Sequence, residues 1–333
     1  MVSGSGMSLD TTMSVQGTQR GPASYRRLLE EGRLTQRVAE ARERLRRCHV
    51  CPRHCEVNRL EDERGFCLVG ARPFVSSCGP HFGEEEPLRG RRGSGTIFFG
   101  SCNLRCVYCQ NYEISQLREG TDVSTVELAE MMLSLQDRGC HNINLVTPSH
   151  QVPQILEGLL VAADRGLRIP LVYNTSSYDE LGTLRLLDGV VDLYLPDFKY
   201  SDAAVALRYS QVESYPAVAK AAIKEMHRQV GNLVLDEQGL AVRGVLVRHL
   251  VLPGGLAGTA EVMRFLAEEL SPDTYVNIMD QYRPCYKGFH YPPLNRGITA
   301  EEFEEAVRLA KVNGLRRLHH ERPGTAVAWL AEL

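Results

Sequence analysis

The sequence predicts an α/β protein: a partial (β/α)6 TIM-like barrel preceded by a small helical module rich in cysteine. From residue 94 onward, short apolar runs with strand character alternate with helical patterns, which is typical of a parallel sheet with right-handed crossovers. About six such units fit into this region, and an eight-unit barrel usually takes ~250 residues. An open, partial barrel therefore fits the length better than a closed one.

The expected elements follow from the spacing of apolar residues. Strands are expected at 96–100, 143–147, 169–175, 190–196, 245–252 and 275–279. Helices are expected near 124–138, 151–166, 178–188, 214–229, 259–270 and 299–313. Polar residues follow the strands, and ligands of such sheets sit at the carboxyl ends of the strands. We therefore expect the functional site at that edge.

The segments outside the barrel differ from it in composition. The expected division is a disordered tail at 1–22, a helical and four-cysteine module at 23–93, the barrel at 94–320 and a C-terminal tail or helix at 321–333. One or two amphipathic helices are expected between Tyr25 and Arg47. His319 and His320 are expected in an exposed turn before the final helix.

Composition and charge argue against several classes of protein. A net charge of −3 offers no general attraction for nucleic acid or anionic membranes. No run of about 18 apolar residues is present, and the first residues lack the apolar core of a signal peptide. Seven of the ten cysteines fall into two tight clusters, which favours metal ligation over a disulfide framework. We expect a cytoplasmic protein with no membrane or nucleic-acid partner.

Three cysteines lie within eight residues directly after the first expected strand. Cys102, Cys106 and Cys109 are spaced C-x3-C-x2-C. Iron–sulfur clusters are usually held by four cysteines, so a triplet with no fourth cysteine nearby predicts one iron open to an outside ligand. A structural zinc loop is the alternative, but zinc takes four tetrahedral ligands, typically in CxxC pairs.

Four further cysteines upstream form a complete ligand set. They follow the pattern C-x2-C-x3-C-x11-C and are Cys48, Cys51, Cys55 and Cys67. A closed set of four thiols predicts either a structural zinc ion or an auxiliary four-iron four-sulfur cluster, and the sequence leaves both open. Cys78, Cys140 and Cys285 are isolated, and each is expected to be a small buried apolar residue.

The Cys102–Asn111 stretch, with an aromatic residue before its last cysteine, resembles the signature of the radical S-adenosylmethionine (SAM) enzymes, in which SAM caps the open iron through its amino and carboxylate groups. The chain resembles pyruvate formate-lyase activating enzyme, and most closely its poorly characterised relatives with an N-terminal cysteine motif. This likeness spans about residues 45–315. The motifs that carry it are Cys48–Arg53, Cys102–Asn111, Val146–His150, Asp192–Tyr200 and Val247–Gly254.

The resemblance implies roles for particular residues. Cys102, Cys106 and Cys109 are expected to hold a four-iron four-sulfur cluster, with Tyr108 near the SAM adenine. Lys199 is expected to meet the SAM carboxylate, and Asp197 to hold a cation or lie near the sulfonium; a surface ion pair is the alternative. Further SAM contacts are expected from Asn174, Ser176 and Arg248.

One motif departs from the family pattern. Where many members carry Gly-Gly-Glu after the second strand, this chain has Thr147-Pro148-Ser149-His150. Backbone carbonyls can still accept the hydrogens of the SAM ammonium. That leaves His150 for acid–base catalysis or substrate contact, with a structural histidine as the alternative.

The expected activity is reductive cleavage of SAM to methionine and a 5′-deoxyadenosyl radical, which abstracts hydrogen from a substrate. The chain would then be an oxidoreductase-type enzyme similar to activating enzymes, served by a low-potential reductant such as flavodoxin or ferredoxin. Its substrate is a protein, a peptide or a small molecule. The N-terminal cysteine module is not the arrangement of well-known activases, so an unassigned substrate ranks above glycyl-radical activation. A non-catalytic iron–sulfur or zinc protein, for binding or electron transfer, is the alternative.

Overall fold

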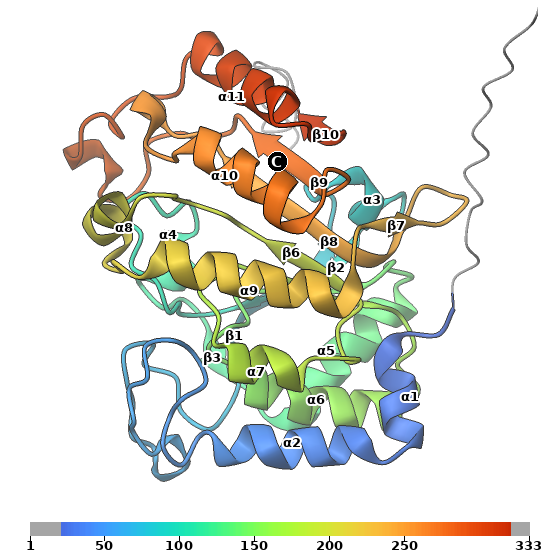
Figure 1. Cartoon of the computed structure of the whole chain (residues 1–333). Coiled ribbons are helices and arrows are strands. Elements are labelled where there is room, and N and C mark those ends of the chain that lie inside the picture. The colour runs from blue at the N-terminus through green and yellow to red at the C-terminus, as the bar shows by residue number, and fades with distance from the viewer. Residues whose placement is uncertain (1–20, 321–333) are drawn as a thin grey trace, which may run out of the picture.

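The computed structural model describes residues 21–320, so the predicted segment 321–333 and nearly all of the predicted tail at 1–22 lie outside the described residues (Figure 1). Within residues 21–320 the chain forms a mixed α/β fold around a sheet of ten strands, in the order β10-β9-β8-β6-β5-β4-β2-β1-β3 with β7 paired to β8. The strands are β1 Phe74–His81, β2 Ser94–Phe99, β3 Thr121–Asp122, β4 Ile143–Val146, β5 Leu171–Thr175, β6 Leu193–Pro196, β7 Val234–Leu235, β8 Ala241–Leu250, β9 Tyr275–Met279 and β10 Arg317–His320.

The parallel part of the sheet confirms the predicted partial barrel. The six predicted strands correspond to β2, β4, β5, β6, β8 and β9, and each pairs in parallel with the next. Side chains of β4, β5 and β6 are almost entirely buried, as expected for strands covered on both faces.

The end of the described chain differs from the prediction. His319 and His320 lie in β10, which pairs in parallel with β9, so the predicted exposed turn is wrong. Residues Arg317–His320 carry three basic or titratable side chains in four positions and show no apolar alternation. Their strand conformation therefore comes from pairing with β9 rather than from local propensity.

Helices connect successive strands where the apolar spacing predicts them. The α-helices are α1 Ser24–Glu30, α2 Arg33–Glu43, α3 Glu86–Arg89, α4 Tyr112–Ser115, α5 Thr125–Asp137, α6 Val152–Asp164, α7 Leu181–Leu186, α8 Ala203–Ser210, α9 Tyr215–Val230, α10 Thr259–Phe265 and α11 Ala300–Val312. A π-helical turn at Leu266–Leu270 continues α10, and short 3-10 turns occupy Arg59–Glu61, Pro253–Gly255 and Gly288–His290. Figure 1 shows α1, α2, α5, α6 and α7 gathered on one side of the molecule and α10 and α11 on the other.

Local signals set the starts of two of these helices. Ser124 and Glu127 form a capping box at the start of α5, and Thr299 and Glu302 form another at the start of α11. Each box satisfies backbone N–H groups that have no partner within the helix. The starts of both helices therefore follow directly from the sequence.

The predicted amphipathic helices before the first cysteine cluster are α1 and α2, and α2 packs against α6. The backbone N–H and hydroxyl of Ser24 donate to Asp192 Oδ1 at 2.9 and 2.7 Å, while the N–H of Leu171 donates to Asp192 Oδ2 at 2.9 Å. One buried carboxylate thus fastens α1 to the start of β5.

An antiparallel extension completes the sheet before the parallel strands. β1 pairs antiparallel with β2 through an irregularity between Val75 and Ser77, and β3 pairs antiparallel with β1. β1 lies within the range predicted as the N-terminal module, and the predicted division at residue 94 stays a prediction. No helix within residues 21–320 combines the length and apolar character that crossing a membrane requires.

We predict that Asp192→Ala lowers the free energy of unfolding by about 1–3 kcal/mol, because a partly buried donor on α1 and a buried donor on β5 lose their acceptor. Chemical denaturation followed by circular dichroism measures the change. Asp188→Ala, which removes an exposed partner of Arg228, is the matched control and should change stability by no more than about 0.5 kcal/mol. Equal effects of the two substitutions would show that Asp192 does not fasten α1.

Candidate active site

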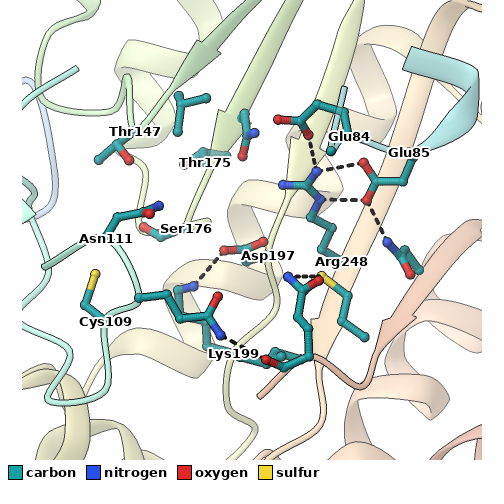
Figure 2. Close-up of a pocket in the computed structure, with 18 of the residues that line it drawn as sticks. Glu84, Glu85, Cys109, Asn111, Thr147, Thr175, Ser176, Asp197, Lys199 and Arg248 are labelled. Carbon is teal, nitrogen blue, oxygen red and sulfur yellow. Dashed lines mark hydrogen bonds and ion pairs between the residues drawn. The ribbon is translucent and has the colours of Figure 1, made fainter. Parts of the chain in front are cut away.

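A cavity of about 600 Å³ opens at the carboxyl ends of the parallel strands (Figure 2). This volume lies within the usual range of small-molecule sites. Its wall includes nine of the residues predicted to bind the cluster or SAM: Cys102, Cys106, Cys109, Tyr108, Asn174, Ser176, Asp197, Lys199 and Arg248. His150 and the four upstream cysteines are not part of this wall.

The loop that carries the three cysteines begins at a tightly held turn after β2. The N–H of Gly100 donates to the carbonyl of Phe74 at 2.9 Å, and the Gly100 carbonyl accepts from His150 Nε2 and Gln151 Nε2, each at 3.1 Å. A Cβ at Gly100 would collide with the Phe74 ring. Ser101 follows with a φ of +65°, which turns the chain toward the cavity.

Two of the three thiols have a hydroxyl neighbour. Ser210 Oγ donates to Cys106 Sγ at 2.9 Å, and Ser115 Oγ lies 3.1 Å from Cys109 Sγ. Burial raises the pKa of Cys102 to about 12 and that of Cys106 to about 11, so these thiols are protonated in the absence of metal. Because the thiolate is the metal ligand, a bound metal displaces these protons.

The donor set fits an iron–sulfur cluster. Three thiols from one loop face one cavity, and hydrogen bonds to sulfur of the kind made by Ser210 are known to tune such clusters. Among residues 21–320, no three Cys, His, Asp or Glu side chains form a group that could hold a single metal ion. A four-iron cluster is larger than one ion, and its ligands stand further apart around it.

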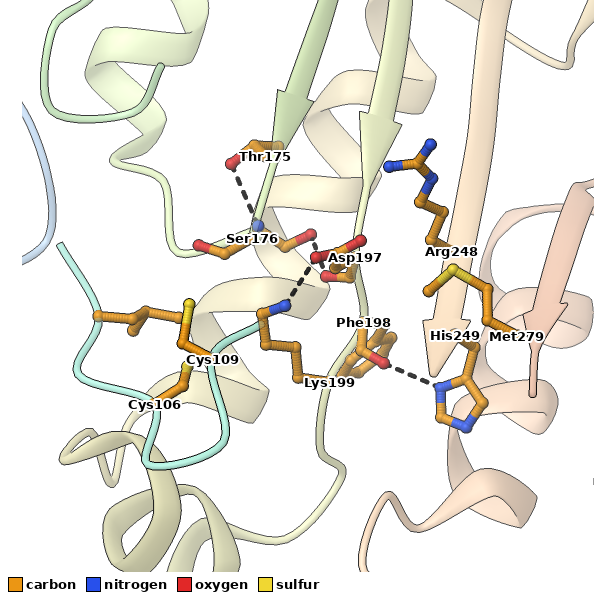
Figure 3. A network of polar contacts seen from close by, with 12 residues as sticks. Cys106, Cys109, Thr175, Ser176, Asp197, Phe198, Lys199, Arg248, His249 and Met279 are labelled. Atoms are coloured by element: carbon orange, nitrogen blue, oxygen red, sulfur yellow. Dashed lines mark hydrogen bonds and ion pairs between the residues drawn. The ribbon is translucent and has the colours of Figure 1, made fainter. Parts of the chain in front are cut away.

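Asp197 and Lys199 follow β6 and meet inside the cavity. Lys199 Nζ donates to Asp197 Oδ2 at 2.6 Å, and both side chains are about one-quarter exposed (Figure 3). Burial alone would lower the pKa of Lys199, but the nearby Asp197 carboxylate and Cys106 sulfur raise it above its ordinary value. The lysine is therefore charged, and an ammonium has three donors of which Asp197 takes one. An anionic group in the cavity can take another.

The end of β5 contributes polar groups beside this pair. Asn174 and Ser176 line the cavity, and the carbonyl of Asn174 accepts the N–H of Thr147 at 2.9 Å. Thr147 also lines the cavity and has a φ of +60°, so the segment that replaces Gly-Gly-Glu turns sharply at its first residue. In the Thr147–His150 motif, which departs from the family pattern, Thr147 therefore lines the cavity and His150 does not.

Arg248 meets carboxylates that the sequence prediction missed. Its guanidinium forms two hydrogen bonds of 2.7 Å with Glu85 and a third with Glu84, and Asn277 Nδ2 donates to Glu85 Oε1 at 2.7 Å. Burial alone would raise the pKa of Glu84, but Arg248 and His81 hold it at about 2. Figure 2 shows this group across the cavity from Cys109. The run of three glutamates at 84–86 was the available signal.

His150 lies beneath the cysteine loop. Its ring is fully buried, and Nε2 donates to the Gly100 carbonyl at 3.1 Å. Burial, with a smaller effect from Arg59, lowers the pKa of His150 to about 3, so the imidazole is neutral. This placement matches the structural alternative, and the geometry gives no support to the predicted catalytic role.

The four upstream cysteines gather in their own module. Cys48, Cys51 and Cys67 are buried and Cys55 is half-buried. Burial raises the pKa of Cys51, and the other three sulfurs raise it further, so each of the three lies within electrostatic reach of Cys51. Gly65 permits this packing, because a Cβ there would lie 2.7 Å from Cys55 Sγ. Like the triplet, these four thiols are not arranged around a point that could hold a single ion, and four thiols are the usual ligand set of a four-iron four-sulfur cluster.

The match to one protein family agrees with this chemistry, and relatives and a solved structure are also found. The family model described as the radical SAM superfamily matches residues 96–254. The protein MJ0674 of Methanocaldococcus jannaschii is 36% identical over 286 residues, which cover 84% of this chain and 78% of that protein. MJ0808 of the same organism is 26% identical over 301 residues, covering 82% and 80%. A solved radical SAM methyltransferase from Sphaerobacter thermophilus has a TM-score of 0.49 at 13% identity, covering 68% of this chain and 66% of that one.

We predict that Ser210→Ala makes the reduction potential of a cluster bound through Cys106 more negative, because the sulfur loses a hydrogen bond that would stabilise the added electron. A hydrogen bond worth about 1 kcal/mol corresponds to a shift on the order of 40 mV for one electron. Redox titration followed by EPR measures it. Ser77→Ala, at a serine on β1, is the control and should leave the reduction potential unchanged. If the potential is also unchanged in Ser210→Ala, Ser210 does not tune the cluster.

Proposed function

Since residues 96–254 form a radical SAM superfamily domain, we propose that Cys102, Cys106 and Cys109 hold a four-iron four-sulfur cluster at which SAM is cleaved, and that the resulting radical removes a hydrogen atom from a substrate. One observation carries the assignment of residues. The three thiols, the Asp197–Lys199 pair and the polar end of β5 line one cavity, although they lie far apart in the sequence.

The cofactors would carry out the chemical step, and the chain would bind and orient them. When bound, the reduced cluster would supply the electron that splits a carbon–sulfur bond of the SAM sulfonium. Lys199 is suited to the SAM carboxylate, because its ammonium is charged and faces the cavity. The carbonyl and hydroxyl oxygens at Asn174, Ser176 and Thr147 are suited to the SAM ammonium and ribose, since each can accept a hydrogen bond.

Tyr108 is suited to the adenine. Its buried ring lines the cavity and contacts the rings of Tyr200 and Tyr282 edge to face, at centroid distances of 6.2 and 5.9 Å. These contacts hold the ring in one orientation. Arg248 is held by Glu84 and Glu85, so we place it on the substrate side of the cavity rather than against SAM.

The substrate class is a separate matter from the cleavage of SAM. We propose two classes of substrate. One is a partner protein on which the enzyme forms a glycyl radical, as in the activating enzymes that the chain resembles. The other is a peptide or a small molecule. A low-potential reductant such as flavodoxin or ferredoxin would supply the electron.

We further propose that Cys48, Cys51, Cys55 and Cys67 hold a second centre, either zinc or a four-iron four-sulfur cluster. Four thiols leave no open position for a substrate, so its role is structural or electron-relaying. The two cysteine sets lie near each other, because the guanidinium of Arg53 is within electrostatic reach of Cys51, Cys55 and Cys102.

We predict that anaerobically reconstituted protein with dithionite and SAM forms 5′-deoxyadenosine. The triple variant Cys102→Ala, Cys106→Ala, Cys109→Ala should form none, because no cluster with an open iron remains. Liquid chromatography of the products and iron and sulfide counts measure this: about four irons indicate one cluster and about eight indicate two. Cys78→Ala is the control for loss of a cysteine outside both sets. Intact protein with a full cluster but no 5′-deoxyadenosine would favour the non-catalytic alternative.

We predict that Lys199→Met weakens SAM binding by about 10- to 100-fold, the loss expected for one charge-assisted hydrogen bond. Anaerobic equilibrium dialysis with labelled SAM measures the dissociation constant. Lys224→Met, which removes an exposed partner of Glu269, is the matched control. An unchanged dissociation constant in Lys199→Met would place the SAM carboxylate elsewhere in the cavity.

A further inference from the structure

Arg59 is a fully buried arginine in the four-cysteine module. Its exposed fraction is 1%, and its guanidinium donates to the Gly70 carbonyl at 3.0 and 3.2 Å, to the His150 carbonyl at 2.8 Å and to Cys48 Sγ at 3.9 Å. Within residues 21–320, none of these partners is a carboxylate. The hydrogen-bond partners of this buried guanidinium are therefore carbonyl oxygens and a sulfur.

Such an arrangement requires a counter-charge. Moving an ionised group from water into a protein interior costs free energy that neutral dipoles only partly offset. The groups nearby that can become anions are the cysteines, and Cys48 Sγ lies 3.9 Å from Arg59 Nη1. Four thiolates around a doubly charged zinc ion or cluster keep a net negative charge.

We propose that Arg59 is the counter-ion of the four-cysteine centre, and that it positions the loop of Cys102, Cys106 and Cys109 through its hydrogen bond to His150, which in turn bonds to Gly100. This proposal rests on the second metal centre proposed above. It assigns to the N-terminal centre a direct structural effect on the site of SAM cleavage.

The connection runs through three hydrogen-bonded residues. Arg59 Nη1 donates to the His150 carbonyl at 2.8 Å, and His150 Nε2 donates to the Gly100 carbonyl at 3.1 Å. Gly100 lies two residues before Cys102. Because a carbonyl only accepts, Nε2 of His150 carries the hydrogen, and the neutral ring keeps this tautomer. Displacement of Arg59 therefore shifts the residue at which the cysteine loop begins.

A second contact joins the same two segments. Arg53 Nε donates to the Asn103 carbonyl at 2.9 Å, and its guanidinium lies 3.7 Å from the centre of the Phe66 ring. Phe66 precedes Cys67, and its carbonyl accepts from Arg105 Nη2 at 3.1 Å. The four-cysteine module thus touches the cysteine loop at its start and at its middle, which restricts independent movement of either segment.

The first experiment isolates the four-cysteine centre. In full-length protein carrying Cys102→Ala, Cys106→Ala and Cys109→Ala, zinc and iron are counted, and their release to a chromophoric chelator is timed. Adding Arg59→Met should speed release about tenfold or more, the change expected when a buried charge-assisted contact is lost. Arg46→Met, at an exposed arginine of the same module, should release metal at the parental rate.

The second experiment uses the intact triplet. The EPR spectrum of the reduced cluster with SAM should broaden or shift in Arg59→Met and remain parental in Arg46→Met. Arg59→Lys keeps the positive charge but loses the planar guanidinium and its several N–H donors. This variant should therefore retain metal while its EPR spectrum still changes. It also replaces Arg59→Met if that variant does not fold.

Each outcome has one meaning. If metal release from Arg59→Met is as slow as from the parent, Arg59 is not the counter-ion. If both Arg59 variants give the parental EPR spectrum, Arg59 does not position the cysteine loop. If the triple cysteine variant binds no metal at all, the second centre does not exist and this inference falls with it. Formation of 5′-deoxyadenosine by the intact protein would leave the assignment of SAM cleavage standing.

Discussion

The placement of the proposed cluster depends on the backbone of one residue, Gly100. Its N–H and carbonyl are both used, by Phe74 and by the side chains of His150 and Gln151, and the Phe74 ring leaves no room for a side chain. A loop anchored in this way leaves β2 in one direction only. Three thiols consequently face the carboxyl ends of the neighbouring strands, where the other cavity residues already lie.

The charges of the cavity differ between its two sides. Beside the cysteines, Asp197 and Lys199 cancel each other, so an incoming ligand with both a carboxylate and an ammonium, as SAM has, finds a partner of each sign. On the far side two buried carboxylates share the single guanidinium of Arg248. The side of the cavity opposite the cysteines is therefore lined by charged side chains that hydrogen bonds hold in place.

Local sequence patterns predicted much of the fold and part of the site. The strand Tyr275–Met279 and the capping boxes of α5 and α11 are local signals, and the cysteine triplet needs no knowledge of the fold. The pairing of Arg248 with Glu84 and Glu85 joins residues more than 160 positions apart, which spacing cannot reveal. His150 follows a strand as a ligand residue would, but the turn at Thr147 directs the chain so that its ring packs under Gly100.

The central claim is that SAM binds the open iron of a cluster held by Cys102, Cys106 and Cys109. The most direct test is electron–nuclear double resonance on the reduced protein with SAM that carries nitrogen-15 in its amino group and oxygen-17 in its carboxylate. Hyperfine coupling of both labels to the cluster is the predicted result. A cluster whose spectrum shows no coupling to either label, at a SAM concentration that saturates binding, would contradict the account.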